Sequence, residues 1–147
     1  MVETVFSASF LLVLPFWLLM VFLPTWSGTQ RVMRSPLSVA PAALLYTALV
    51  APRVPEVLAG VASPELGGVA ALLGSPAGAT IGWVHFLTFD LFVARWAYLD
   101  SRERSVNPFV MAPVLFVTLM LGPVGFLAYL FLRRTLGSRT FTRDEVV

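Results

Sequence analysis

The sequence predicts an all-α membrane protein with four transmembrane helices and one short interfacial helix. Two observations support this fold class. Hydrophobic residues make up 58% of the 147 residues and charged residues only 12%, whereas about a quarter of the residues of a soluble domain are charged. The apolar residues also fall in long runs that follow helix-start signals. A disordered chain and a water-soluble enzyme domain are both excluded by this composition.

The first predicted span is the apolar run from Val5 to Leu23, which contains no charged residue. At about 1.5 Å per helical residue it is long enough to cross a hydrocarbon core. The only early charge is Glu3, so a basic region typical of a cleaved signal peptide is missing. We expect a retained transmembrane helix, with a kink at Pro15 because proline removes a backbone donor.

Four dipeptides predict the starts of the remaining helices. Each places a capping side-chain oxygen before a proline, whose fixed φ suits the first helical position. These dipeptides are Ser35-Pro36, Ser63-Pro64, Ser75-Pro76 and Asn107-Pro108.

The first two of these starts predict a short span and an interfacial helix. From Pro36 the sequence is apolar over Leu37 to Pro52 and then meets Arg53, which predicts a short second span. The stretch from Glu65 to Leu73, ended by Gly74, is too short to cross a bilayer. We expect it to lie at the interface or over the bundle.

The last two starts predict the third and fourth spans. The third helix is expected from Pro76 to about Arg104, and the fourth is apolar from Phe109 to Leu132. Gly122-Pro123 should break or bend the fourth helix. Residues 1–136 are expected to form a single domain and residues 137–147 a polar tail.

Charge and cysteine content limit topology and chemistry. Four spans would place both termini on one side of the membrane. Five arginines then lie on that side and four on the opposite side. By the positive-inside rule this gives only a slight preference for cytoplasmic termini. The chain has no cysteine, so disulfides and sulfur-held zinc or iron–sulfur sites are excluded. We expect no metal site and no nucleic-acid partner. The arginines at helix ends are better explained by anionic lipid headgroups.

Three polar side chains, His85, Asp90 and Arg95, interrupt the third predicted span. An Asp or Arg at the bilayer centre costs about 2.5 to 3.5 kcal/mol, so such residues usually face a protein interior and have a partner. Asp90 cannot pair well with Arg95 because intrahelical pairs need a spacing of three or four residues. Candidate partners on other helices are Ser7, Ser9, Tyr46, Thr47, Thr118 and Tyr129.

These three residues are the candidate catalytic groups, with Asp90 able to act as an acid or to relay a proton. The aromatic residues of the same helix have two interpretations, helix packing with interface belts or contact with a flat or rod-like apolar ligand. The candidate ligand-binding residues are Trp83, Phe86, Phe89, Phe92 and Trp96. We interpret the charged turn that begins at Asp100 as a solvated boundary, and the small residues Gly74, Gly78 and Gly82 as a packing surface.

A group of segments along the chain has a recognisable pattern: Pro15 to Met20, Arg31 to Pro36, His85 to Phe92 with Arg95-Trp96 and Asp100, and Gly122-Pro123 with Gly125. In these segments the chain resembles the abscisic-acid-deficient-four-like family, over roughly residues 5 to 133. In plants this family is associated with formation of neoxanthin from violaxanthin. The resemblance implies a carotenoid as ligand or substrate, with Asp90 and His85 as the acid and base for epoxide opening.

Three classes of function follow. The leading hypothesis is a multi-pass protein of a bacterial inner membrane that binds or isomerises a carotenoid-like isoprenoid and needs no other cofactor. The alternative is a non-catalytic, pigment-holding subunit of a larger membrane complex or homo-oligomer. Proton or ion passage is the third class, suggested only by Asp90.

Overall fold

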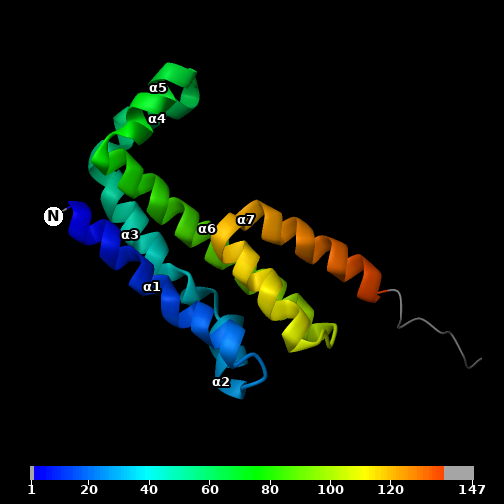
Figure 1. Ribbon diagram of the computed structural model, residues 1–147. Coiled ribbons are helices and arrows are strands. Elements are labelled where there is room, and N and C mark those ends of the chain that lie inside the picture. The colour runs from blue at the N-terminus through cyan, green and yellow to red at the C-terminus, as the bar shows by residue number, and fades with distance from the viewer. Residues whose placement is uncertain (1, 138–147) are drawn as a thin grey trace, which may run out of the picture.

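The computed structural model describes residues 2–137, and the described part of the chain is helical without strands (Figure 1). Four helical stretches are long and apolar enough to cross a membrane, which confirms the predicted fold class. They are Val2–Phe22, Ala40–Ala62, Pro76–Glu103 and Pro108–Thr135. Nearly all of the predicted polar tail, residues 138–147, lies outside the described residues.

The centre of the bundle is the packing of α1 (Val2–Phe22) against α6 (Pro76–Glu103). The buried side chains of α1 lie on one side of the helix and include Val13, Trp17 and Met20. They pack against buried small and apolar residues of α6, among them Leu91 and Ala94. Helix α1 continues through Pro15 as a single helix, so the proline does not divide the span.

A short helix that the sequence did not predict, α2 (Ser27–Arg34), closes the end of α1. The hydroxyl of Thr29 donates to the carbonyl of Leu23 at 2.8 Å, which folds α2 back under α1. From α6, the hydroxyl of Tyr98 donates to the carbonyl of Pro24 at 2.6 Å. Because the carbonyls at a helix end lack intrahelical partners, these bonds fasten the turn to the bundle.

The second span is longer than the sequence predicts. It begins with the 3-10 turn η1 (Pro36–Ser38) and α3 (Ala40–Val50), and continues through the 3-10 turn η2 (Ala51–Arg53) into α4 (Val54–Ala62). The predicted end at Pro52 is therefore wrong. Pro52 lies early in η2, where a proline is tolerated because the first residues of a helical turn need no backbone donor.

The predicted interfacial helix is α5 (Leu66–Gly74), within one residue of its expected bounds. Together α4 and α5 form a helical hairpin that projects from the end of the bundle (Figure 1). Where α5 meets α6, a Cβ on Gly78 would overlap the carbonyl oxygen of Leu72, and one on Gly82 would lie 3.2 Å from Leu73. Two of the three small residues therefore form the expected packing surface.

Helix α7 (Pro108–Gly137) breaks at Leu121, whose φ of −140° and ψ of 52° are not helical. The predicted break at Gly122-Pro123 is confirmed. We call residues 108–120 the first arm and residues 122–137 the second arm. Pro123 falls in the first turn of the second arm, where its missing N–H costs nothing.

The second arm runs back along α6 rather than onward. Gly122 lies against Asp90, the ring of Phe126 is centred 5.8 Å from that of Trp96, and Nε of Arg133 lies 3.0 Å from Asp100. The second arm therefore runs parallel to α6, from the middle of α6 toward its C-terminal end. Figure 1 shows the same reversal, with the yellow first arm and the orange second arm meeting at an apex.

This reversal places the two ends of the described chain at opposite ends of α6. The start of α1 lies at the start of α6, where the rings of Phe6 and Trp83 are 5.4 Å apart. The end of α7 lies near the end of α6, where Arg133 pairs with Asp100. The prediction that both ends lie on one side is therefore wrong for the described residues, because it assumed a bend in α7 and not a reversal.

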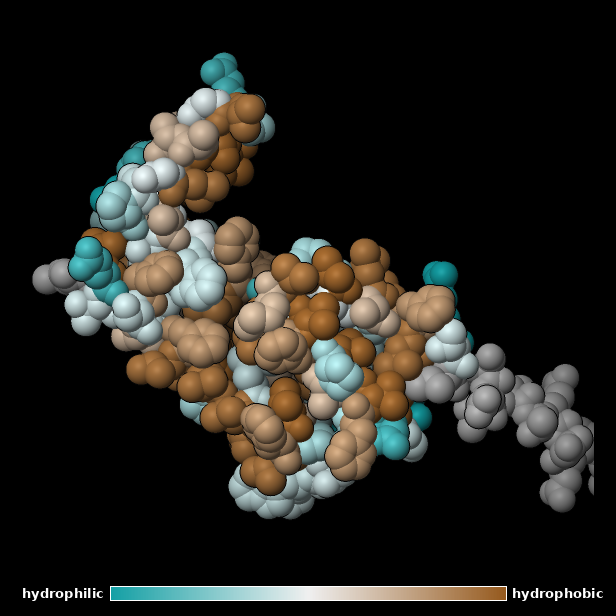
Figure 2. Space-filling model, in the orientation of Figure 1, coloured by the Kyte–Doolittle hydropathy of each residue, from teal (hydrophilic) through white to brown (hydrophobic). Residues whose placement is uncertain are grey.

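The surface of the bundle is suited to lipid. Figure 2 shows apolar residues over most of the visible face, with hydrophilic residues gathered at the extremities. Large side chains such as Leu44, Phe109 and Phe131 are more than two-thirds exposed. In water such a continuous apolar surface would mark an interaction site, and across several long helices it is the expected contact with acyl chains.

Candidate functional site

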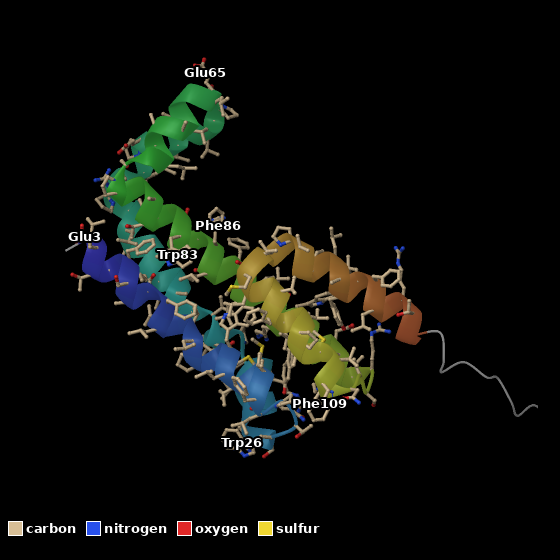
Figure 3. All side chains as sticks on the ribbon, viewed as in Figure 1. Glu3, Trp26, Glu65, Trp83, Phe86 and Phe109 are labelled. Carbon is tan, nitrogen blue, oxygen red and sulfur yellow. The ribbon has the colours of Figure 1, made fainter. Side chains whose placement is uncertain are left out.

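A groove of about 720 Å³ lies between the middle of α6 and the apex of α7. It has this place because the reversal at Leu121 holds the apex across α6. Figure 3 labels two of its residues on α6, Trp83 and Phe86. The lining residues are Trp83, His85, Phe86, Leu87, Phe89, Asp90 and Val93 from α6, with residues 119–124 and Phe126 from α7.

Asp90 meets the backbone of α7 and not a side chain. A Cβ on Gly122 would overlap Oδ1 of Asp90, so only glycine allows this approach. Gly122 also begins the second arm, and the first turn of a helix carries free N–H groups and a partial positive charge. The carboxyl of Asp90 therefore lies at a helix end that favours an acidic group.

The expected hydroxyl partners of Asp90 are engaged elsewhere. Ser9, Thr47 and Thr118 each donate to a carbonyl of their own helix, and Tyr129 donates to Asp100. Within residues 2–137 the Asp90 carboxyl makes no hydrogen bond. The prediction of a side-chain partner is therefore wrong for these four hydroxyls, and the partner that Asp90 does have is the α7 backbone.

His85 lines the same groove, although it is well separated from Asp90 around the α6 axis. Its exposed ring lies among aromatic rings, with centroids 4.7 Å from Phe89 and 5.4 Å from Tyr46 of α3. The groove can include both residues because the α7 apex lies across more than one face of α6. An imidazole and a carboxyl are thus held beside one apolar groove, a pair able to exchange protons with a bound molecule.

The five candidate ligand-binding aromatics separate into two groups. Trp83, Phe86 and Phe89 line the groove. Phe92 is half exposed on the outside of α6 and does not line it. Trp96 packs edge-on against Tyr129 at 5.5 Å, and the guanidinium of Arg133 lies 5.6 Å from its ring centre. Trp96 therefore holds the second arm of α7.

Arg95, the third candidate catalytic residue, lies apart from the groove. Its Nη2 donates to the carbonyl of Arg34 at 2.9 Å, at the end of α2. A guanidinium that satisfies a helix-terminal carbonyl fastens two elements together. The structure thus brings Asp90 and His85 to one groove and assigns Arg95 to the contact between α2 and α6.

Asp100 is not part of a solvated boundary, contrary to the sequence interpretation. Its side chain is only 14% exposed and accepts hydrogen bonds from Tyr129, Arg104 and Arg133. Bonding to this carboxylate raises the pKa of the Arg104 guanidinium above its ordinary value. We call these four residues the Asp100 cluster, and it fixes the second arm to the end of α6.

Sequence reasoning missed the half of the site that α7 supplies. Leu121, Gly122 and Phe126 line the groove, but the sequence signalled only a break at Gly122-Pro123. In the structure Gly125 takes part in the same close approach, because a Cβ there would overlap the backbone of Thr118. Two glycines three residues apart beside a proline are suited to two helix arms in close approach. Among the described residues no group of three acidic or histidine side chains could hold a metal ion.

Comparison with known proteins gives one family. The family model described as ABA DEFICIENT 4-like matches residues 4–129. The chain is 33% identical over 111 residues to the chloroplastic protein ABA DEFICIENT 4 of Arabidopsis thaliana, an alignment that covers 71% of this chain. The chain spans 50% of the length of that curated relative. No solved structure matches the chain.

Proposed function

Because the chain belongs to the ABA DEFICIENT 4-like family, related to a neoxanthin-synthesis protein of plants, we propose that it binds a carotenoid-like isoprenoid in the α6–α7 groove. The observation that carries the proposal is the lining of the groove, which is aromatic and aliphatic except for His85 and Asp90. Its volume of about 720 Å³ lies within the range of about 300 to 1,000 Å³ typical of ligand sites.

The position of the groove also supports a lipid-borne ligand. It lies at the middle of α6, among exposed side chains such as Phe86 and Phe89, which are more than half exposed. An isoprenoid dissolved in the membrane could therefore enter sideways between the acyl chains and the α7 apex. The protein's place as an integral membrane protein follows from its four apolar helices. A bacterial inner membrane stays a prediction, and the curated relative is chloroplastic by name.

We propose further that the protein isomerises a xanthophyll by acid–base chemistry. Asp90 would protonate the epoxide oxygen as the carbon–oxygen bond breaks, and His85 would accept a proton from the adjacent polyene carbon. One proton is gained and one is lost, so the product is an isomer of the substrate and no oxidant is needed. The partial positive charge at the start of the second arm would stabilise the carboxylate that Asp90 becomes.

The test is purification of the full chain in mild detergent from a carotenoid-producing host, followed by absorption spectroscopy and mass analysis. We expect a carotenoid to co-purify, and Phe89→Ala to lower its occupancy. Phe131→Ala is the matched control, because Phe131 lies on the second arm, is 73% exposed and does not line the groove. Absence of pigment, or equal loss in both variants, would contradict the binding proposal.

Catalysis is tested separately with an added epoxy-xanthophyll. We expect Asp90→Asn and His85→Gln each to lower turnover about 100-fold or more while the pigment still binds, since a positioned acid or base contributes about 10² to 10⁴ in rate. Bound pigment that leaves chemically unaltered from the native chain would instead support the alternative, a non-catalytic pigment-holding subunit. Turnover unchanged in Asp90→Asn would remove that residue from the mechanism.

A further inference from the structure

We propose that a second cavity, at the arginine-rich end of the bundle, binds the phosphate group of an anionic membrane lipid. This inference does not depend on the function proposed for the α6–α7 groove. The cavity measures about 720 Å³ and lies where α2, the last turn of α6 and the start of α7 meet. Its polar lining includes Gln30 and Arg34 from α2, Arg102 from α6, and Asn107 at the turn.

The cavity carries uncompensated positive charge. Within residues 2–137, neither Arg34 nor Arg102 forms an ion pair. The nearby carboxylate of Asp100 is paired with Arg104 and Arg133 instead. Among the residues that the structure describes, the only carboxylate in the lining is that of Glu103. Two guanidinium groups against one carboxylate leave a net attraction for an anion.

The Arg102 side chain is fixed in position, and one of its donors has no partner among the described residues. Its Nη2 donates to the carbonyl of Val106, which fixes the side chain against the α6–α7 turn. Its Nε is buried and has no hydrogen-bond partner among the described residues. A buried donor without a partner costs free energy, so the described residues leave a polar group unsatisfied at this end of the bundle. The planar guanidinium is also well suited to phosphate, because it can donate two parallel hydrogen bonds.

Asn107 provides a neutral donor in the same cavity. Its side-chain oxygen accepts from the N–H of Phe109 at 2.9 Å, so its amide nitrogen remains to donate to a ligand.

The surroundings of the cavity favour a lipid over a soluble phosphate. Leu99 and Phe109 also line the cavity, and Phe109 is 88% exposed. A headgroup phosphate bound here would have its acyl chains beside the apolar surface of α7.

The proposal is tested on the full chain, purified in detergent and depleted of lipid. Native mass spectrometry measures adducts after addition of phosphatidylglycerol or phosphatidylcholine. We expect selective retention of phosphatidylglycerol, with affinity about tenfold lower in Arg34→Gln and in Arg102→Gln, since hydrogen bonds to charged groups are the strong ones. Arg34→Gln keeps the fold intact because the Arg34 side chain is exposed and makes no hydrogen bond with a described residue.

Two further variants separate a cavity from general surface charge. Arg31→Gln removes the same charge from the same helix, but Arg31 does not line the cavity, so we expect less than twofold change. Glu103→Gln should strengthen binding. Equal weakening by Arg31→Gln and Arg34→Gln would overturn the proposal, and so would equal retention of both lipids. Displacement of the lipid by millimolar inorganic phosphate would overturn the assignment to a lipid and leave a phosphate site.

Discussion

The contact between Asp90 and Gly122 determines the geometry of the groove. A carboxyl in the middle of a membrane helix needs a favourable environment, and here the backbone at the start of the second arm provides it. The sequence predicted that Asp90 must have a partner. It could not identify that partner, because a glycine contributes only the absence of a side chain to the contact.

Substituting Gly122→Ala should destabilise the fold by about 1 to 3 kcal/mol, because the added methyl group overlaps Asp90 Oδ1. The same substitution should cost much less when Asp90 is alanine, giving a coupling free energy of about 0.5 to 3 kcal/mol. Equilibrium unfolding in detergent micelles measures all four proteins of the cycle. Gly67→Ala is the control, since a Cβ at Gly67 would meet nothing within 4 Å. Strict additivity would contradict the contact.

At the scale of elements, the second arm of α7 is fixed by the Asp100 cluster and by Trp96. Arg133 contributes twice, through its bond to Asp100 at 3.0 Å and through its position 5.6 Å from the Trp96 ring centre. Tyr129 is fully buried and donates to the same carboxylate. Several interactions to one residue hold this arm beside α6, which keeps the apex over the groove.

Asp100→Asn should therefore loosen the second arm, with a loss of about 1 to 3 kcal/mol because hydrogen bonds to a charged group are weakened. Hydrogen exchange should rise in residues 122–137 and stay unchanged in the first half of α6. Glu56→Gln is the matched control. It breaks the Arg53–Glu56 pair, whose side chains are 42% and 57% exposed, and exposed pairs contribute about 0 to 1 kcal/mol. An unchanged second arm in Asp100→Asn would show that the cluster does not hold it.

The elements were predictable where a local signal marked them. Serine before proline located the starts of η1 and α6, and the hydroxyl oxygen of Ser75 accepts from the N–H of Gly78 at 3.0 Å. Helix α2 was missed because it has no apolar run and is stabilised by tertiary hydrogen bonds such as that of Thr29. The reversal of α7 was missed because a Gly-Pro pair indicates a break without specifying its angle.

At the scale of the whole molecule, the reversal changes the distribution of charge. Counted along four straight spans, the arginines divide almost evenly between the two sides. With α7 folded back, one end of the bundle carries seven arginines of the described chain, and the other end carries Arg53. By the positive-inside rule, the arginine-rich end should face the cytoplasm in a bacterial host. The seven residues are Arg31, Arg34, Arg95, Arg102, Arg104, Arg133 and Arg134, with Arg95 donating to the carbonyl of Arg34.

Only the α6 half of the candidate site could be predicted, because the sequence did not show that α7 reverses. His85 and Asp90 were identified because polar groups in an apolar helix are rare, and Trp83, Phe86 and Phe89 were identified as aromatic residues of the same helix. The periodicity of one helix cannot show what packs against it. Arg95 and Trp96 were therefore grouped with the site by proximity in sequence, whereas α2 and the second arm place them in structural contacts.

The most direct test of the α7 reversal is the sidedness of single cysteines, since the chain contains none of its own. Asn107→Cys and Thr135→Cys mark the two ends of α7, and Glu3→Cys marks the start of α1. A membrane-impermeant maleimide applied to intact bacterial cells should label Glu3→Cys alone, and applied to inverted vesicles it should label the other two. Labelling of Asn107→Cys and Thr135→Cys from opposite sides would contradict the reversal, and with it the groove that the α7 apex forms over Asp90.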